Sequence, residues 1–480
     1  MDPRESIFLD FKLPNPTSWF YLSLLVTLAL FFRFKQVFSL RNWDLVMLFA
    51  LVPALLYLSE SREARLQQSA AYAGRTLLES GVLQCSSGQF GGAVVQVVES
   101  SRTQAEAAHA NQRAERDVWR AYLALLIGST YFLVRCLVDL AIARRPPFVP
   151  SLGVGGLTFL GCALLIVLSA KTLLPPAEAV PDGQATSVVL EKATEVAAQA
   201  ASQVNQDRLD IDPAFWRRLM AIVCHVVVVA GLVWIGWRQF QSLHAGIGSA
   251  VLYLLLPYTA RYTQDLRQVL PAALVVLAFV AYRRPLVAGI VLGFASGIVY
   301  YPLMLFPAWF GFYRGKGAWR FAVGFAVVLA SIVAYVLLDP TLRPLMQSAL
   351  LFPDWQAWDL SQKPVGEGLW SAVELHFAYR APLFIAYLAM VVATAFWPSP
   401  KNLGHLMAIS TALILGVQFW YADAGGIYVL WYLPLLILVT VRPNLSTRTA
   451  PDLQPGPGPV RRLWTWLHKH LSKPAHQPVA

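Results

Sequence analysis

Long apolar segments separated by short charged turns make up most of this chain of 480 residues. A segment that crosses lipid must satisfy its own backbone hydrogen bonds, so only helices and closed barrels span a bilayer. The chain is poor in charge, with 14% charged and 57% hydrophobic residues, whereas soluble domains carry roughly 25% charged residues. The sequence therefore predicts an all-α fold, a polytopic transmembrane helical bundle with helical extracytoplasmic loops.

We predict about thirteen spans, choosing apolar runs near the length that a helix needs to cross roughly 30 Å of hydrocarbon. Several runs are short, so breaks or re-entrant pieces are an open alternative. Residues 1–17 carry acids instead of a basic stretch, so the first run is expected to stay as a helix and not to be cleaved as a signal. The predicted spans are residues 18–33, 42–58, 119–142, 151–173, 215–236, 245–257, 268–282, 285–299, 301–313, 320–338, 380–397, 403–420 and 426–441.

The distribution of basic residues orients these spans. With the N-terminus outside, the short turns that face the cytoplasm hold 12 Lys and Arg and no Asp or Glu. The opposite face collects acids, above all in the segment 175–213. Because cytoplasmic loops are enriched in Lys and Arg, we predict a multi-pass protein of the cell (inner or plasma) membrane with an extracytoplasmic N-terminus and a cytoplasmic C-terminus.

This topology divides the chain into membrane parts and loops. The first long loop is Ala-rich, and its helical periodicity is interrupted at Ser86-Ser87-Gly88 and Gly91-Gly92, so we predict helices joined by a flexible turn. The parts are an N-terminal membrane hairpin at 1–58, this extracytoplasmic helical loop at 59–118, a membrane hairpin at 119–174, an extracytoplasmic loop at 175–214, a membrane core at 215–442 that includes the extracytoplasmic loop 339–379, and a basic, Pro-rich cytoplasmic tail at 443–480.

A polar patch at residues 258–268 interrupts the apolar runs in the middle of the chain. It carries Arg261 and Arg267 on a turn that the topology places outside, against the charge asymmetry of the protein. A guanidinium fork matches the geometry of a phosphate, so the two arginines predict an anionic ligand. An ion pair of either arginine with Asp265, or contact with lipid headgroups, is the alternative that the sequence leaves open.

Other residues on the outer side are candidates for contact with a substrate. In the loop 339–379, Trp355 and Asp359 belong to a set of interleaved aromatic and acidic residues that could stack on sugar rings and bind their hydroxyls. Tryptophans also anchor loops at membrane interfaces, which is the alternative. Asp423 lies on a short outer turn, where an acid serves either sugar hydroxyls or the turn itself.

Polar residues inside apolar runs are interpreted as structural. Arg135 and Asp139 are four residues apart, the spacing at which side chains on a helix meet, so an intramembrane ion pair is favoured over a proton relay. His225 and His405 have no second ligand at metal spacing, and the four Cys form neither a disulfide framework nor a metal pattern. We therefore expect no metal and no cofactor.

Several stretches in the second half of the chain resemble a known family. They are Gln268 followed by a span, Arg283-Arg284-Pro285-Leu286-Val287-Ala288-Gly289, Tyr301-Pro302-Leu303-Met304-Leu305-Phe306-Pro307, Gly317-Ala318-Trp319-Arg320, Gln418-Phe419-Trp420-Tyr421 and Val429-Leu430-Trp431-Tyr432-Leu433-Pro434. Over about a third of the chain they are similar to the GT-C polyprenol-phosphate-mannose-dependent mannosyltransferases. The chain departs from that family near Tyr300 and Tyr301, where members usually have a Lys, and at Arg267, where they usually have a Gly.

The resemblance implies a GT-C-like membrane core and an integral membrane glycosyltransferase. Such an enzyme transfers a sugar, mannose in the family, from a polyprenyl-phosphate donor to an extracytoplasmic acceptor. Its partners would be membrane lipids and the lipid-linked donor, with no nucleic acid. The family places a catalytic Asp or Glu in the first large extracytoplasmic loop. Here that loop is the one that begins after residue 58, and the candidates in it are Glu60 and Glu63. An inverting transfer needs such a carboxylate as its base, and cations for the departing lipid phosphate.

The remaining candidates take the other roles in this hypothesis. Arg261, Arg267 and Gln268 would bind the donor phosphate, and the substrate would contact Tyr258, Asp265, Trp355, Asp359 and Asp423. Two other classes stay open. One is a transporter or flippase for a lipid-linked or anionic solute, although no inverted repeat is evident. The other is a non-catalytic membrane scaffold that keeps a GT-C-like bundle.

Overall fold

A computed structural model of the chain describes residues 16–82, 90–142, 148–173, 213–338, 368–370, 377–421 and 425–451. Throughout these ranges the regular structure is helical, apart from one isolated antiparallel bridge between Asn402 and Thr449, which confirms the all-α class. The α-helices are α1 (Pro16–Phe31), α2 (Leu40–Val82), α3 (Phe90–Val138), α4 (Val154–Leu173), α6 (Pro213–Trp234), α7 (Leu243–Leu255), α8 (Pro257–Arg261), α9 (Leu266–Val280), α10 (Pro285–Ile298), α11 (Phe306–Phe312), α12 (Ala318–Leu338), α14 (Arg380–Phe396), α15 (Leu403–Trp420) and α16 (Val429–Val441).

Six helical segments in the described ranges are long and apolar enough to cross a membrane, as expected of a helical membrane protein. They are Leu40–Arg62, Gln112–Ala141, Val154–Leu173, Phe215–Gln239, Ala318–Tyr335 and Leu403–Trp420. Further apolar helices of 10 to 17 residues, among them α7 and α16, lie beside them. Every predicted span overlaps a helical segment. The number of segments that cross the membrane stays a prediction.

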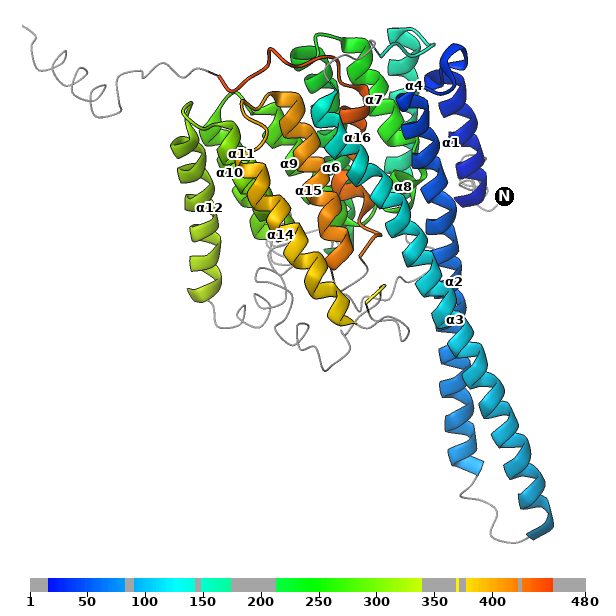
Figure 1. Cartoon of the computed structure of the whole chain (residues 1–480). Coiled ribbons are helices and arrows are strands. Elements are labelled where there is room, and N and C mark those ends of the chain that lie inside the picture. Colours follow the sequence, from blue (N-terminus) through cyan, green and yellow to red (C-terminus); the bar gives the residue numbers. More distant parts are fainter. Residues whose placement is uncertain are drawn as a thin grey trace, which may run out of the picture.

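The centre of the bundle is formed by α15 and α16. The apolar window of α15 is 89% buried, and every residue of α16 is buried. A helix that is apolar on all sides belongs in the interior of a helical protein. The corresponding windows of α4 and α12 are only 17% buried, and α12 lies at the edge of the bundle opposite to α1 (Figure 1).

A two-helix projection made of α2 and α3 extends far beyond the rest of the bundle (Figure 1). The apolar segment of α2 ends at Arg62, but the helix continues to Val82. Because α3 begins at Phe90, Gly91 and Gly92 lie inside its first turn, and the predicted interruption there is wrong. Glycine costs a helix only about 1 kcal/mol, which the rest of a long helix offsets. The other predicted interruption, at residues 86–88, lies outside the described residues.

Prolines mark where several helices of the central region begin. Pro257 and Pro285 are the first residues of α8 and α10, where a missing N–H costs no helical hydrogen bond. Pro302 lies in the 3₁₀ segment η4 (Tyr301–Leu305), which leads directly into α11. The chain therefore reverses direction over short distances and brings polar residues between apolar helices.

Glycines allow close contact between α10 and α12. A Cβ atom on Gly289 would lie 2.2 Å from the carbonyl oxygen of Phe321, and one on Gly324 would lie 2.5 Å from that of Leu286. A Cβ atom on Gly293 would likewise lie 2.9 Å from the carbonyl oxygen of Phe325. Small residues at helix interfaces allow backbones to approach in this way.

Because successive helices alternate in direction, their turns gather at two ends of the bundle. We call the end that carries Arg238, Arg283 and Arg442 the basic end. The opposite end carries α8 and the residues that follow it, and we call it the Tyr262 end. The projection of α2 and α3 leaves the bundle at the Tyr262 end (Figure 1).

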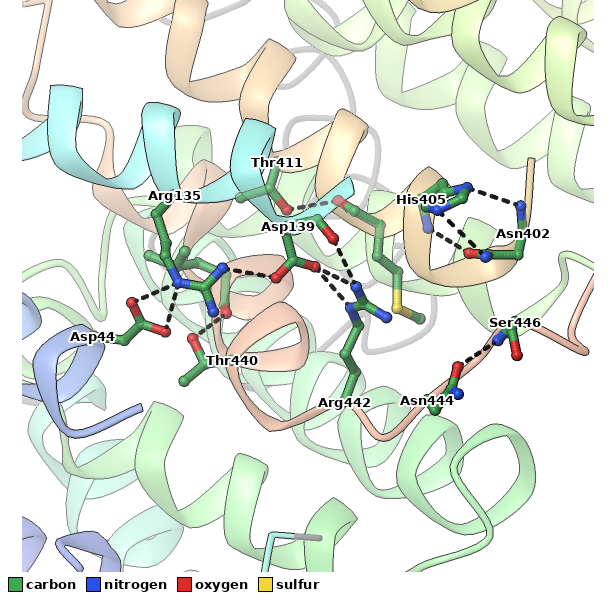
Figure 2. A network of polar contacts seen from close by, with 12 residues as sticks. Asp44, Arg135, Asp139, Asn402, His405, Thr411, Thr440, Arg442, Asn444 and Ser446 are labelled. Carbon is green, nitrogen blue, oxygen red and sulfur yellow. Dashed lines mark hydrogen bonds and ion pairs between the residues drawn. The ribbon is translucent and has the colours of Figure 1, made fainter. Parts of the chain in front are cut away.

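A buried ionic network joins three elements at the basic end (Figure 2). Arg135 Nε lies 3.0 Å from an oxygen of Asp44, and Arg135 Nη1 donates to Asp139 at 2.7 Å. The second oxygen of Asp139 accepts from Arg442 Nε at 2.9 Å and from Nη2 at 2.5 Å. The predicted pairing of Arg135 with Asp139 is therefore present, and it belongs to a larger set that connects α2, α3 and the end of α16.

Candidate functional site

The polar patch folds as a short helix and a capped turn. Leu256 is extended, Pro257 starts α8, and the chain turns at Tyr262 before α9 begins. Asp265 caps α9, because its side chain accepts a hydrogen bond from the backbone N–H of Arg267 at 3.1 Å. Residues 262–265 are thereby fixed between two helices at one end of the bundle.

Tyr258 and Thr259 fix the position of α8 through hydrogen bonds of their hydroxyl groups. Both are 0% exposed. The Tyr258 hydroxyl donates to the carbonyl of Leu48 on α2 at 2.6 Å, and the Thr259 hydroxyl donates to the carbonyl of Tyr253 at 2.5 Å. Tyr258, a predicted substrate contact, therefore fastens α8 to α2.

The predicted phosphate ligands Arg267 and Gln268 lie around Asp265. Arg267 Nε is 3.6 Å from Asp265 Oδ1, so the ion pair that the sequence left open is present. The Gln268 amide donates to Asp265 Oδ2 at 3.1 Å, and its own carbonyl oxygen is buried without a partner among the described residues. Trp431 on α16 donates from its indole nitrogen to the carbonyl of Arg267 at 3.2 Å, which ties the start of α9 to the core.

Cations from several elements lie near residues 260–262. Lys171, at the end of α4, donates to the carbonyl of Ala260 at 2.5 Å and lies within electrostatic range of the exposed Arg261. Arg62 on α2 donates to the Tyr122 hydroxyl, with its guanidinium 5.6 Å from the centre of that ring. Burial raises the pKa of Tyr262 to about 12, and the nearby positive charges of Arg62 and Arg261 act in the opposite direction. We call Arg62, Lys171 and Arg261 the cation cluster.

A continuous group of aromatic rings lies at the same end of the bundle. We call it the aromatic cluster, and it consists of Tyr300, Tyr301, Tyr387, Trp420, Tyr421, Tyr428 and Trp431. Tyr428 stacks on Trp431 with ring centres 4.2 Å apart, and Tyr301 stacks on the same indole at 4.5 Å. Since Trp431 also contacts Arg267, the aromatic cluster adjoins the polar patch.

The predicted catalytic residues lie on α2 beside the cation cluster. Glu60 is exposed, two residues before Arg62, and Glu63 follows Arg62 in the same helix. The helix therefore brings both positions to the Tyr262 end. Trp355, Asp359 and Asp423, the other predicted substrate contacts, lie outside the described residues.

Sequence reasoning missed two members of the cation cluster and most of the aromatic cluster. Lys171 was included in a predicted span, and Arg62 was read as part of a loop. A signal was present, because a Lys at the outer end of an apolar run opposes the charge asymmetry as Arg261 does. The aromatic cluster gives no such signal, since its rings come from η4, α14, α15 and α16, and Tyr residues at span ends are ordinary interfacial residues.

His225 makes contacts between helices. His225 Nδ1 lies 2.9 Å from the Tyr253 hydroxyl and Nε2 lies 3.2 Å from the carbonyl of Thr263, so this side chain packs between helices as predicted. Throughout the part of the chain that the structure describes, no group of at least three His, Cys, Asp or Glu residues could hold a metal ion.

The fold and these clusters define a helical membrane protein whose Tyr262 end joins cations to a layer of buried aromatic rings. Comparison of the chain with protein-family models, with curated proteins and with solved structures finds no match.

Proposed function

We propose that this protein is an integral membrane glycosyltransferase that moves a sugar, mannose being the candidate, from a polyprenyl-phosphate donor to an extracytoplasmic acceptor. The observation that carries the proposal is the cation cluster around Tyr262. Its members come from α2, α4 and α8, so their approach is a product of the fold. The carboxylate within electrostatic range of Tyr262, that of Asp265, already accepts from Gln268 and from the backbone of Arg267.

The proposal assigns an anionic ligand to these cations. In the proposed topology the basic end faces the cytoplasm, and the Tyr262 end faces the outside, where Lys and Arg are depleted in loops. Arg62, Lys171 and Arg261 therefore occur where the general rule does not expect them. A lipid phosphate at the membrane surface would neutralise them, Lys171 acting as a point charge and the arginines as hydrogen-bonding forks.

The proposed reaction is a displacement at the sugar carbon that carries the lipid phosphate. An outer carboxylate, Glu60 or Glu63, takes the proton of the acceptor hydroxyl. The acceptor oxygen forms a bond to that carbon while the bond to the phosphate oxygen breaks, and the cation cluster holds the charge that develops on the departing lipid phosphate. In this assignment Arg267 supports the turn through Asp265 and contributes charge nearby.

Binding of a polyprenyl phosphate without sugar tests the cation cluster. Arg261→Ala and Lys171→Met should each weaken binding to protein in nanodiscs by roughly 1 to 3 kcal/mol, the scale of a hydrogen bond to a charged group. Arg238→Ala is the matched control, because it removes one exposed cation from the basic end and should leave binding unchanged. Wild-type affinity in both test variants would contradict a phosphate site at this end of the bundle.

Sugar transfer tests the enzyme itself. With mannosyl and glucosyl polyprenyl phosphates in proteoliposomes, replacement of the true base by Gln at position 60 or 63 should cut turnover roughly 100-fold while the protein stays folded. A wild-type protein that binds the lipid phosphate but transfers no sugar would favour the scaffold alternative. Movement of the intact lipid between leaflets, without transfer, would favour a flippase.

A further inference from the structure

Buried phenols at the Tyr262 end have hydroxyls with no hydrogen-bond partner in the described part of the chain. They belong to Tyr300, Tyr301 and Tyr387. Tyr301 is 0% exposed and Tyr387 is 4% exposed, so water does not replace the missing partner at the surface. A hydroxyl that leaves water without gaining a partner raises the free energy of the folded state. Several such groups in one aromatic cluster indicate a partner that the protein does not supply.

Tyr300 and Tyr387 both contact the indole ring of Trp420. The ring centres of Tyr300 and Trp420 are 5.8 Å apart, and those of Tyr387 and Trp420 are 5.6 Å apart. The phenols of Tyr300 and Tyr387 are within electrostatic range of each other. Gly416 makes room for this arrangement, since a Cβ atom there would lie 2.8 Å from the Tyr387 ring.

The cluster has a partly exposed edge toward the Tyr262 end. Tyr300 and Tyr421 are half-buried, and their ring centres are 5.4 Å apart. Through Tyr421 and Trp431, whose ring centres are 6.3 Å apart, this edge continues to the carbonyl of Arg267. Tyr300 therefore belongs both to this edge and to the residues whose hydroxyl has no partner in the described part of the chain.

The chemistry of this surface fits a sugar better than a lipid chain or a phosphate. A pyranose ring offers a face of C–H groups that packs on aromatic rings, and hydroxyls that both donate and accept hydrogen bonds. An isoprenoid chain would pack against the rings, but it has no group that could form hydrogen bonds with the phenol hydroxyls. Arg380 lies within electrostatic range of Tyr300 and Tyr421, but it is 2% exposed and its Nε donates to the carbonyl of Trp420 at 2.6 Å. A phosphate would be drawn to the more exposed Lys171 and Arg261 of the cation cluster.

We propose that the aromatic cluster binds the pyranose ring of a sugar, with the hydroxyls of Tyr300 and Tyr387 bonded to sugar hydroxyls and the Tyr421 ring against the sugar face. This inference rests on the proposed function, and it adds the position of the sugar to that of the phosphate. The contact between Trp431 and Arg267 places the two sites next to each other.

The experiment compares three probes on the full-length protein in nanodiscs: a polyprenyl phosphate, the same lipid carrying a hexose, and a free methyl hexopyranoside. Tyr300→Phe and Tyr387→Phe should each lower affinity for a sugar-bearing probe by roughly 2- to 12-fold, the range of one hydrogen bond. Affinity for the sugar-free lipid should not change. Loss confined to the lipid-linked hexose assigns the site to the donor sugar, and loss confined to the methyl hexopyranoside assigns it to the acceptor.

Thermal unfolding separates binding from a structural role. Because the two hydroxyls have no partner in the protein, the Phe variants should unfold at the wild-type temperature or above it. The control is Tyr313→Phe near the basic end, whose hydroxyl donates to the carbonyl of Tyr282 at 2.5 Å. It should lower the unfolding temperature and leave binding of all probes unchanged.

Two results would overturn the inference and leave the cation cluster intact. One is a wild-type protein that binds the sugar-free lipid as tightly as the hexose-bearing lipid and does not bind the methyl hexopyranoside. The other is unchanged sugar affinity in both Phe variants. A wild-type protein that binds none of the probes would instead contradict the proposed function as well.

Discussion

At the scale of single residues, Asp139 is a buried carboxylate at the centre of the ionic network. It is 0% exposed and accepts hydrogen bonds from both Arg135 and Arg442 (Figure 2). Burial lowers the pKa of Arg442 to about 10, with the positive charge of Arg135 acting in the same direction, so this guanidinium stays charged at neutral pH. The carboxylate of Asp139 therefore balances cations that cannot reach water.

Asp139→Asn should destabilise the protein by roughly 3 to 5 kcal/mol, because removing one partner of a buried ion pair leaves the other charge uncompensated. Thermal or denaturant unfolding in detergent would measure the loss. Arg120→Ala provides the control: Arg120 pairs with Asp117 at 3.4 Å, but its side chain is 66% exposed, and exposed pairs contribute roughly 0 to 1 kcal/mol. Equal losses in the two variants would contradict the account of the network.

The sequence predicted only the local part of this network. Arg135 and Asp139 were paired by their spacing of four residues on one helix, and the structure confirms that interpretation. Asp44 and Arg442 are 91 and 303 residues distant from their partners in the chain. Such contacts depend on which helices become neighbours, and hydrophobic periodicity does not specify that. The same reason explains why Lys171 and Tyr387 were not recognised as neighbours of the predicted site.

At the scale of elements, the Gly-spaced run in α10 is an interface. Gly289→Ala should destabilise the protein by roughly 1 to 3 kcal/mol, because the added methyl group would meet the backbone of Phe321 and force α10 and α12 apart. Unfolding in detergent is again the measurement. The comparison is Gly155→Ala in α4, where the methyl group would find no atom within 4 Å and helix propensity alone favours Ala by up to about 1 kcal/mol. A Gly289→Ala protein as stable as the Gly155→Ala protein would mean that the two helices separate at no cost.

The positions of the helices were largely predictable, but the continuity of the longest helices was not. Apolar runs located a helix at each predicted span, since apolar composition is a local property of the chain. Helices were predicted in the loop 59–118, but not that they continue the membrane segments as the single helices α2 and α3, because the polar continuations carry no membrane signal. The short α8 was read as part of a polar patch, although Pro257 at its start is a helix signal.

At the scale of the whole molecule, the two ends of the bundle differ in chemistry. The basic end carries the ionic network and the turns rich in Lys and Arg, and the Tyr262 end carries the cation cluster, the aromatic cluster and the projection of α2 and α3. A transfer reaction between a lipid donor and an extracytoplasmic acceptor requires the Tyr262 end to face outward. Orientation in the membrane is therefore the property on which the proposed function and the sugar site both depend.

Reporter fusions that distinguish the two sides of the membrane test this orientation directly. A fusion at Lys401, in a turn of the basic end, should report the cytoplasm, and fusions at Ser87 and Gly366 should report the outside, because 12 basic residues and no acid lie in the turns predicted to face inward. Lys401 and Gly366 on the same side would contradict the alternation of the helices. If all three signals were reversed, the cation cluster would lie on the cytoplasmic side. The positive charge of Arg62, Lys171 and Arg261 would then need no special ligand, and the argument for an outward-facing lipid-phosphate site would lose its main support.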